Sequence, residues 1–370
     1  MKYYIIAGEA SGDLHGSNLM KNLFKHDPNA EIRFWGGDLM QKNGGTLVKH
    51  YRDLAFMGFA EVVMNLKTIL NNIKFCKADI LKFQPDVIIY IDYPGFNMRI
   101  AKWAKPLGFK NHYYISPQIW AWKENRIKAI KNDVDKMYVI LPFEKDFYEK
   151  KHHFPVEFVG HPLIDAIHQR PKTDAEQFKK DHNLDERPII ALLPGSRKQE
   201  ISKMLTEMLS VRNDFPEYQF VIAGAPSQEF SFYQQFLTND QVHFISNKTY
   251  DLLSVSHAAL VTSGTATLET ALFKVPEVVL YKGNWISYQI AKRIITLKYI
   301  SLVNLIMDKE VVTELIQGEC NPKRIKEELQ KLLNPETRNR LLAEYDALEN
   351  KLGGDGASEK TAQLIIDNIK

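Results

Sequence analysis

Short apolar runs alternate with longer amphipathic stretches along most of the chain. In the first half, apolar runs bounded by glycine, proline or polar residues cover residues 3–7, 87–91, 113–115 and 137–141. Stretches with helical spacing separate these runs, and the first helix is expected from about Leu14. Buried strands that alternate with helices are typical of a parallel sheet covered on both faces. The first half therefore predicts a doubly wound α/β domain.

The same pattern begins again after a polar stretch rich in Lys and Asp at residues 169–187. The strands expected in this half lie at residues 189–193, 220–223, 260–262 and 277–281. We therefore expect two Rossmann-like domains, at residues 1–168 and 169–345, that face each other across a cleft. The charged, helical end of the chain, residues 346–370, forms a tail for which packing against the first domain is one alternative.

The composition is that of an ordinary globular protein and argues against several functional classes. The chain has 370 residues, of which 45 % are hydrophobic and 25 % charged, which suits two domains with substantial cores. A formal net charge of +3 falls short of the clustered basicity of nucleic-acid-binding proteins, so no nucleic-acid partner is expected. Cys76 and Cys320 lie far apart, which disfavours a disulfide framework or a zinc site and favours a reducing compartment.

The apolar segment at residues 54–64 is the main candidate for contact with a membrane. No run in the chain approaches the roughly 18 apolar residues that span a bilayer, and the first residues lack the features of a signal peptide. We therefore expect a cytoplasmic protein, soluble or peripheral. Residues 54–64 are apolar on more than one face of a helix, which fits either an ordinary buried helix or contact with lipid. The side chains expected to enter a membrane are Phe56, Met57, Phe59, Val62 and Val63.

Three strand-end loops of the first half carry candidate chemistry, because ligands of open α/β sheets bind at the carboxyl ends of the strands. The first loop lacks the GxGxxG spacing of a dinucleotide site, so it is either a tight turn or a backbone surface for a ligand with Ser11 capping the helix. Asp92 ends the second strand, either as a helix cap or as a general base for a hydroxyl nucleophile. The third loop combines tryptophans with basic residues, which fits core packing or an amphiphilic anion equally well. The acceptor-site candidates are Gly8, Glu9, Ser11, Gly12, Asp13, Ser116, Gln118 and Trp120.

Two loops of the second half suit phosphate. Gly195-Ser196-Arg197 leaves a strand through a glycine turn and ends in an arginine, whose planar fork of donors matches phosphate oxygens. Ser263-Gly264-Thr265 follows another strand and starts a helix, whose terminal amides favour a diphosphate. Glu269 lies about one turn further on and could accept both hydroxyls of a ribose. This half has no clustered carboxylates of the kind that Mg²⁺ requires.

The loops together resemble the lipid-A-disaccharide synthase family. The motifs that carry the resemblance run from Lys2 to about Leu315 and read GEASGD, IDYPGFN, SPQIWAWKENR, LPFE, FVGHPL, LPGSR, SGTATLE and SLVN. The combination of GEASGD, SPQIWAW and LPGSR is specific to that family. The resemblance implies the GT-B fold of two facing Rossmann-like domains, on the cytoplasmic face of the inner membrane of a Gram-negative bacterium.

The resemblance also implies a reaction. 2,3-Diacylglucosamine passes from UDP to the 6-hydroxyl of 2,3-diacylglucosamine 1-phosphate (lipid X), with inversion at the anomeric carbon and release of UDP. Neither a metal nor another cofactor is implied, since the UDP-sugar is a substrate. By motif match Asp92 is the general base, and the UDP-binding set is Gly195, Ser196, Arg197, Ser263, Gly264, Thr265, Glu269 and Asn304. Many members carry a second acidic residue where this chain has Gly95.

Two alternatives remain open. The first is another UDP-N-acetylglucosamine-dependent GT-B transferase or epimerase, for which the apolar 54–64 segment would have no purpose. The second is a non-catalytic nucleotide-binding protein at the membrane surface, which would not need the carboxylate of Asp92. The sequence gives neither the acyl-chain length of the substrates nor the oligomeric state.

Overall fold

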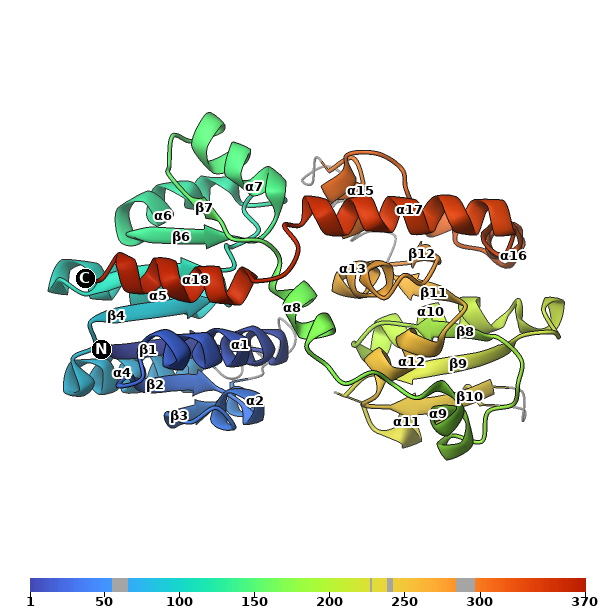
Figure 1. Ribbon diagram of the computed structural model, residues 1–370, viewed down its shortest axis with the longest axis horizontal. Helices are drawn as coiled ribbons and strands as arrows, with labels where there is room; N and C mark the ends of the chain where they lie inside the picture. Colours follow the sequence, from blue (N-terminus) through green and yellow to red (C-terminus); the bar gives the residue numbers. More distant parts are fainter. Residues whose placement is uncertain (55–65, 227, 238–241, 284–296) are drawn as a thin grey trace. The chain divides into compact units, whose positions relative to one another are not determined.

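The computed structural model describes the chain except for residues 55–65, 227, 238–241 and 284–296. It divides into two compact units, the first made of residues 1–169 and 352–370 and the second of residues 170–351 (Figure 1). Each unit is built on a parallel sheet, of seven strands in the first and six in the second. The predicted α/β class is thereby confirmed. The five side chains expected at a membrane, Phe56, Met57, Phe59, Val62 and Val63, lie outside the described residues.

The sheet of the first unit reverses its strand order between β1 and β4. Its order is β3-β2-β1-β4-β5-β6-β7, and every neighbouring pair is parallel. The loops that follow β1 and β4 leave the sheet on opposite sides of this switch point, which is where open α/β sheets bind ligands. The strands are β1 (Lys2–Ala7), β2 (Glu31–Gly36), β3 (Thr46–His50), β4 (Val87–Ile91), β5 (Lys110–Tyr114), β6 (Lys136–Val139) and β7 (Glu157–Phe158).

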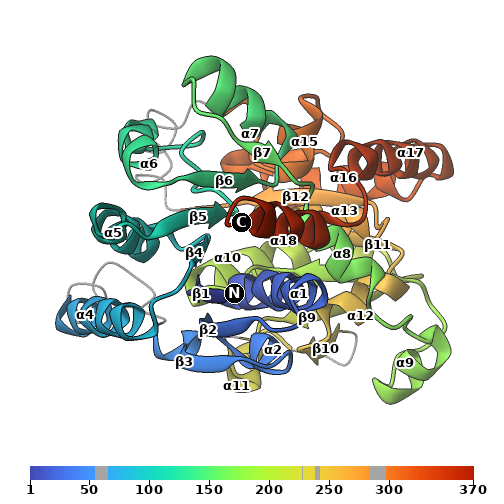
Figure 2. The ribbon, with the colours of Figure 1, turned by 60° about the vertical axis from the view of Figure 1, so that its left-hand side comes forward.

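Helices cover both faces of this sheet. Figure 2 shows α4, α5 and α6 along one face and α1 and α18 on the other. The first helix begins at Ala10, with Glu9 as its N-cap residue and no side-chain cap, so the expectation that Ser11 caps it was wrong. The helices are α1 (Ala10–His26), α2 (Asp38–Gln41), α4 (Leu66–Phe83), α5 (Pro94–Ala104), α6 (Ile127–Asp133), α7 (Pro142–Asp146), α8 (Pro162–His168) and α18 (Ala357–Asp367), with the short turns η1 (Tyr51–Asp53), η2 (Lys105–Leu107), η3 (Glu124–Arg126) and η4 (Phe147–Lys151).

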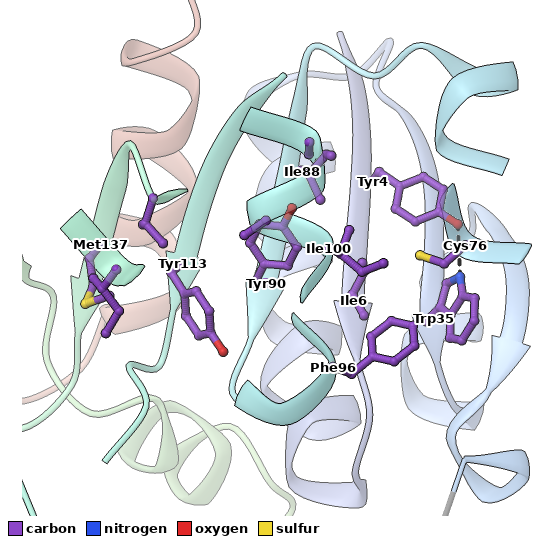
Figure 3. Close-up of a cluster of buried hydrophobic side chains, with 14 of the residues drawn as sticks. Tyr4, Ile6, Trp35, Cys76, Ile88, Tyr90, Phe96, Ile100, Tyr113 and Met137 are labelled. Carbon is purple, nitrogen blue, oxygen red and sulfur yellow. Dashed lines mark hydrogen bonds between the residues drawn. The ribbon is translucent and has the colours of Figure 1, made fainter. Parts of the chain in front are cut away.

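Aromatic side chains form much of the core between this sheet and the helices α4 to α6 (Figure 3). The Trp35 indole donates a hydrogen bond to the Tyr4 hydroxyl at 2.9 Å, and that hydroxyl donates to Asp79 at 2.9 Å. Buried aromatic residues with a polar atom need such partners, because an unpaired donor inside a core costs free energy. Cys76 lies in the same core, and both cysteines of the chain are buried and unpaired.

The second unit repeats the plan with the strand order β10-β9-β8-β11-β12-β13, so its switch point lies between β8 and β11. Its strands are β8 (Ile189–Leu193), β9 (Gln219–Gly224), β10 (Val242–Ser246), β11 (Ala258–Thr262), β12 (Glu277–Tyr281) and β13 (Glu314–Ile316). Its helices are α9 (Ala175–Asp181), α10 (Lys198–Leu209), α11 (Phe230–Gln234), α12 (Thr249–Val255), α13 (Thr265–Leu272), α15 (Leu302–Met307), α16 (Pro322–Leu332) and α17 (Pro335–Lys351), with the short turns η5 (Arg212–Asp214) and η6 (Gln317–Glu319).

The end of the chain belongs to the first unit. After α17 the chain returns at Leu352, and α18 packs beside α1 (Figure 1). The buried carboxylate of Asp165 accepts hydrogen bonds from the backbone amides of Gly356 at 2.7 Å and Ser358 at 2.8 Å. Asp165 thus holds the start of α18, since it satisfies amides that have no partner within the helix.

Candidate functional site

Asp92 is held in a strained backbone at the carboxyl end of β4. Its φ angle is 45° and that of Tyr93 is 49°, in the left-handed region that residues with a side chain rarely adopt. The Asp92 carbonyl accepts hydrogen bonds from the Tyr113 hydroxyl at 2.6 Å and from Nδ2 of Asn97 at 2.7 Å, and its amide donates to the Tyr114 carbonyl at 3.2 Å. Strain persists only where the surroundings fix it, and it is concentrated at functional sites.

The environment of Asp92 suits a general base. The pKa of Asp92 is raised to about 6, mainly by burial and also by the nearby negative charge of Glu9, while a backbone hydrogen bond at Tyr93 opposes the shift. A carboxyl group with this pKa is mostly ionised at neutral pH, yet it binds a proton more readily than an ordinary Asp. Catalytic bases work best when their pKa lies near the working pH.

The loop after β1 and the loop after β4 contact each other at Gly8. A Cβ atom added to Gly8 would overlap with the Tyr93 ring, so only glycine allows this approach. The contact places the β1 loop, with the exposed side chains of Glu9 and Ser11, beside Asp92. The structure therefore brings together Gly8, Glu9 and Asp92, which come from two different strand-end loops.

Two other predicted residues of the β1 loop point into the fold. Gly12 is buried where α1 packs against Ala7. The Asp13 carboxylate is also buried, and it accepts hydrogen bonds from the amides of Gly37 at 2.7 Å, Leu39 at 3.1 Å and Met40 at 3.0 Å. With these donors satisfied, Asp13 anchors α2 and has little capacity left for a ligand.

The loop after β5 is organised by a residue that sequence reasoning did not select. The buried Glu144 of the LPFE motif accepts hydrogen bonds from the Ser116 hydroxyl at 2.5 Å and the Trp120 indole at 3.1 Å. Two predicted residues thus contact Glu144, whereas the third, Gln118, is exposed. The only signal for Glu144 in the sequence was its place in a family motif.

In the second unit, the two phosphate-suited loops line one pocket of about 410 Å³. They reach it from either side of the switch point between β8 and β11. Seven of the eight residues predicted to bind UDP lie in its lining, and the eighth, Asn304, does not. The lining consists of Leu193, Gly195, Ser196, Arg197, Glu200, Ala223, Ala225, Pro226, Thr249, Thr262, Ser263, Gly264, Thr265, Ala266 and Glu269.

The helices α10 and α13 both begin at this pocket, but they offer different electrostatics. At α10, the Glu200 carboxylate accepts a hydrogen bond from the Ser196 amide at 3.1 Å, so a negative charge already lies at this helix start. Glu200 also lies close to Gly195, whose φ of 99° favours glycine. At α13 there is no side-chain cap and no acidic residue in the first turn. Among the described residues, no acceptor pairs with the amides of Thr265 and Ala266. The start of α13 is therefore the better anion site.

Glu269 lines the pocket, and within the described residues only one of its carboxylate oxygens, Oε1, accepts a hydrogen bond. Burial raises its pKa, and a hydrogen bond from the Tyr250 hydroxyl to Oε1 at 3.0 Å opposes that shift. Within the described part of the chain, no cation forms an ion pair with Glu269. A partly buried carboxylate without a cation is well suited to neutral hydroxyl donors.

Asn304 has a structural role in this unit. It is fully buried, and its Oδ1 accepts the amides of Val311 at 2.8 Å and Val312 at 3.0 Å. Its Nδ2 donates to the Val312 carbonyl at 2.8 Å and to Glu314 at 2.9 Å. Each hydrogen-bonding capacity of the amide is thus used within the fold.

Known proteins resemble this chain in sequence, and others resemble it in fold. The sequence profile of the lipid-A-disaccharide synthetase family matches residues 3–365. The lipid-A-disaccharide synthase of Syntrophus aciditrophicus (strain SB) is 39 % identical over 376 residues, which cover 99 % of this chain and 97 % of that protein. The structure of UDP-GlcNAc 2-epimerase from Neisseria meningitidis bound to UDP-GlcNAc aligns with a TM-score of 0.66 at 14 % identity, covering 100 % of this chain and 99 % of that one. The glycotransferase of kitacinnamycin gives the same TM-score, identity and coverage.

These likenesses confirm two predictions. The structural neighbours are GT-B glycosyltransferases and epimerases, which confirms the predicted GT-B fold. The match to the family extends over nearly the full chain, well beyond the motifs quoted above. The chain belongs to the lipid-A-disaccharide synthase family of glycosyltransferases.

Proposed function

We propose that the protein transfers 2,3-diacylglucosamine from UDP to the 6-hydroxyl of 2,3-diacylglucosamine 1-phosphate. The observation that carries this proposal is the strained, hydrogen-bonded position of Asp92, whose pKa of about 6 suits proton removal from a hydroxyl. The named relatives support the same activity at 39 % identity.

The pocket of the second unit is proposed to hold UDP. The diphosphate would lie at the start of α13, where the amides of Thr265 and Ala266 and the exposed guanidinium of Arg197 favour negative charge. Glu269 would accept hydrogen bonds from the ribose hydroxyls. A solved protein of the same fold is described as bound to UDP-GlcNAc, which supports the choice of nucleotide.

The proposed chemistry is a single displacement. Asp92 removes the proton of the acceptor hydroxyl as its oxygen attacks the anomeric carbon from the face opposite UDP, so the configuration inverts. The bond from the anomeric carbon to the diphosphate breaks, and negative charge develops on the leaving group. Arg197 and the amides at the start of α13 stabilise that charge, because fixed donors need no reorganisation as it forms.

We further propose that the reaction needs neither a metal nor another cofactor. In the described residues, no group of three or more His, Cys, Asp and Glu side chains is arranged to hold a metal ion. Arg197 and the α13 amides supply the positive potential that a bound cation supplies in other transferases.

Peripheral association with an anionic membrane is proposed on one face of the first unit. Residues 66–131 contain twelve Lys and Arg but only four Asp and Glu, an excess larger than the +3 of the complete chain. Much of this segment forms α4, α5 and α6, which share one face of the sheet (Figure 2). Leu70, Phe75 and Leu81 of α4 are exposed there. Within the described ranges, no helix is long and apolar enough to cross a bilayer. Apolar side chains combined with lysines fit binding at the headgroup level.

A product assay separates this proposal from its alternatives. Purified protein is incubated with the diacylated UDP-sugar and the diacylated sugar 1-phosphate, and the disaccharide is sought by mass spectrometry. The proposal predicts a disaccharide that forms only when both substrates are present. Conversion of the UDP-sugar without an acceptor would favour an epimerase, and binding of UDP without turnover would favour a non-catalytic protein.

A further inference from the structure

The loop between β5 and η3 is held in one shape by strained residues at both ends. Ile115 has a φ of 64° and Lys123 a φ of 56°. A β-branched residue in the left-handed region is a marked outlier, so the surroundings of Ile115 must enforce it. The segment from Ser116 to Trp122 between them is therefore a preformed structure, which we call the tryptophan loop.

Glu144 enforces this shape from inside the fold. One carboxylate oxygen accepts hydrogen bonds from the Ser116 hydroxyl and the Trp120 indole. The other accepts hydrogen bonds from the backbone amides of Ile140 at 3.2 Å and Leu141 at 2.9 Å. A buried carboxylate with four donors is costly to disturb, because any lost partner leaves a desolvated polar group. Glu144 thus fixes the loop to the end of β6.

The tryptophan loop ends in an aromatic ring that lies near two cations from the residues that follow it. The Trp122 side chain is 47 % exposed. Nζ of Lys123 lies 4.2 Å from the centre of its ring, and Cζ of Arg126 lies 5.7 Å from it. In the residues that the structure describes, no carboxylate pairs with either cation. The nearby acid, Glu124, is engaged by Lys151 at 2.7 Å and His152 at 3.0 Å.

The charge of Arg126 also reaches the strand end proposed as the reaction centre. The Tyr113 hydroxyl donates to the Asp92 carbonyl at 2.6 Å. Burial raises the pKa of Tyr113 well above its ordinary value, the charge of Asp92 adds to this shift, and the charge of Arg126 opposes it. The Arg126 guanidinium therefore lies within electrostatic range of the strand end that carries Asp92. An acceptor whose hydroxyl reaches Asp92 could present an anionic group to Arg126.

We propose that Trp122, Lys123 and Arg126 bind the phosphate monoester of the acceptor, with Glu144 as the positioning residue that holds their loop. This inference rests on the proposed function, because it assumes an acceptor that carries a phosphate. The guanidinium fork matches phosphate oxygens, the ammonium adds a point charge, and the indole covers an apolar flank of the ligand. A rigid loop with one ring and two unpaired cations fits a single headgroup better than a broad lipid surface.

The test compares two acceptors, diacylglucosamine 1-phosphate and the same lipid without its phosphate. For each protein variant, kcat/KM is measured for both acceptors in detergent at saturating UDP-sugar. The unmodified protein should prefer the phosphorylated acceptor by at least tenfold. In the double variant Lys123→Ala, Arg126→Ala that preference should fall to about threefold or less, while the KM for the UDP-sugar stays within about twofold. Trp122→Ala, which changes only an exposed side chain, should lower the preference in the same direction.

A matched control removes two lysines elsewhere in the unit. Lys145 and Lys150 are exposed, and they form ion pairs with Glu149 and Asp146 respectively. The double variant Lys145→Ala, Lys150→Ala removes two positive charges, as Lys123→Ala, Arg126→Ala does. Its acceptor preference should equal that of the unmodified protein. Glu144→Gln should raise the KM for the phosphorylated acceptor more than it changes the KM for the donor.

Each outcome has a distinct meaning. An unchanged preference in the double variant would overturn the phosphate site and leave the proposed function standing. If the double variant no longer binds anionic vesicles but keeps the acceptor preference of the unmodified protein, the phosphate site is also overturned. The tryptophan loop would then be assigned to the membrane. If the unmodified protein transfers sugar to neither acceptor, the proposed function itself fails.

Discussion

The Tyr250 hydroxyl donates a hydrogen bond to Oε1 of Glu269 at 3.0 Å, on the wall of the pocket proposed for UDP. The bond favours the ionised form of Glu269 and occupies one of its carboxylate oxygens. The other oxygen is the one proposed to accept a ribose hydroxyl, so Tyr250 would orient this group without needing to touch the nucleotide.

Tyr250→Phe should therefore weaken the binding of UDP about 3- to 10-fold near pH 6, with a smaller effect at alkaline pH. The lost hydrogen bond lets the pKa of Glu269 rise further, so its carboxylate is lost at a higher pH as the solution is acidified. Calorimetric titration of UDP across a pH series measures this shift. Titration of 2′-deoxy-UDP is the control, since its affinity should respond less if Glu269 binds that hydroxyl. Parallel pH profiles in the two proteins would refute the assignment.

The raised pKa of Asp92 predicts two opposite pH dependences. As general base, Asp92 must be ionised, so kcat/KM should rise with pH up to about 6 and then level off. Folding stability should change in the other direction. The folded state binds the proton more tightly than the unfolded chain, whose Asp has the ordinary pKa of 3.8, so the Asp92 contribution falls as pH rises from about 4 to 6.

Asp92→Asn should consequently stabilise the protein at neutral pH by about 1–3 kcal/mol, because a neutral amide avoids the cost of a partly buried charge. Thermal melting at pH 7 would show a rise of several degrees. At pH 4, where Asp92 is mostly protonated in the folded state, the two melting temperatures should nearly coincide. A lower melting temperature for the variant at pH 7 would show that the charge is favourable where it stands.

Gly95→Asp tests whether an acidic residue at this position takes part in the reaction. Gly95 lies exposed in the first turn of α5, and a Cβ atom added there would meet nothing within 4 Å. An aspartate should stabilise α5 by about 0.5–1.5 kcal/mol, from its interaction with the helix dipole and the removal of a helical glycine. We expect turnover to change by less than about threefold, as judged by initial rates. A tenfold gain would mean that the second acidic residue takes part in the reaction.

Chelation tests the proposal of a metal-free reaction. Activity should be unchanged in excess EDTA, since Arg197 and the α13 amides are proposed to neutralise the leaving group. The matched variant Arg197→Ala should lower kcat by about 10²–10³-fold, because one main donor to the diphosphate is lost. Loss of activity in EDTA that added Mg²⁺ or Mn²⁺ restores would refute the proposal.

The sequence was sufficient to place residues that lie at a strand end. Asp92, Gly195 and Gly264 each lie within two residues of the end of an apolar strand, so the parallel sheets place them at the switch points. The same reasoning could not tell which side chains turn inwards. Asp13 and Asn304 occupy family motifs, yet backbone amides of the fold satisfy both.

Residues that act through another residue escaped prediction. Glu144 bonds to Ser116, which lies 28 residues away in the sequence, and Tyr250 bonds to Glu269, which lies 19 residues away. Neither spacing follows from helix or strand periodicity, because these contacts join different elements of the fold. Such partners become visible only when the sheet order is known.

Asp92→Asn decides whether Asp92 is the general base of the proposed sugar transfer. Disaccharide formation by the unmodified protein and the variant should be measured at saturating substrates and pH 7.5, with UDP affinity determined in parallel. We predict that kcat falls about 10²–10⁴-fold while the affinity for UDP changes less than about twofold. Near-normal turnover in the variant would show that Asp92 is not the general base and would direct attention to Glu9, a nearby carboxylate in the loop after β1.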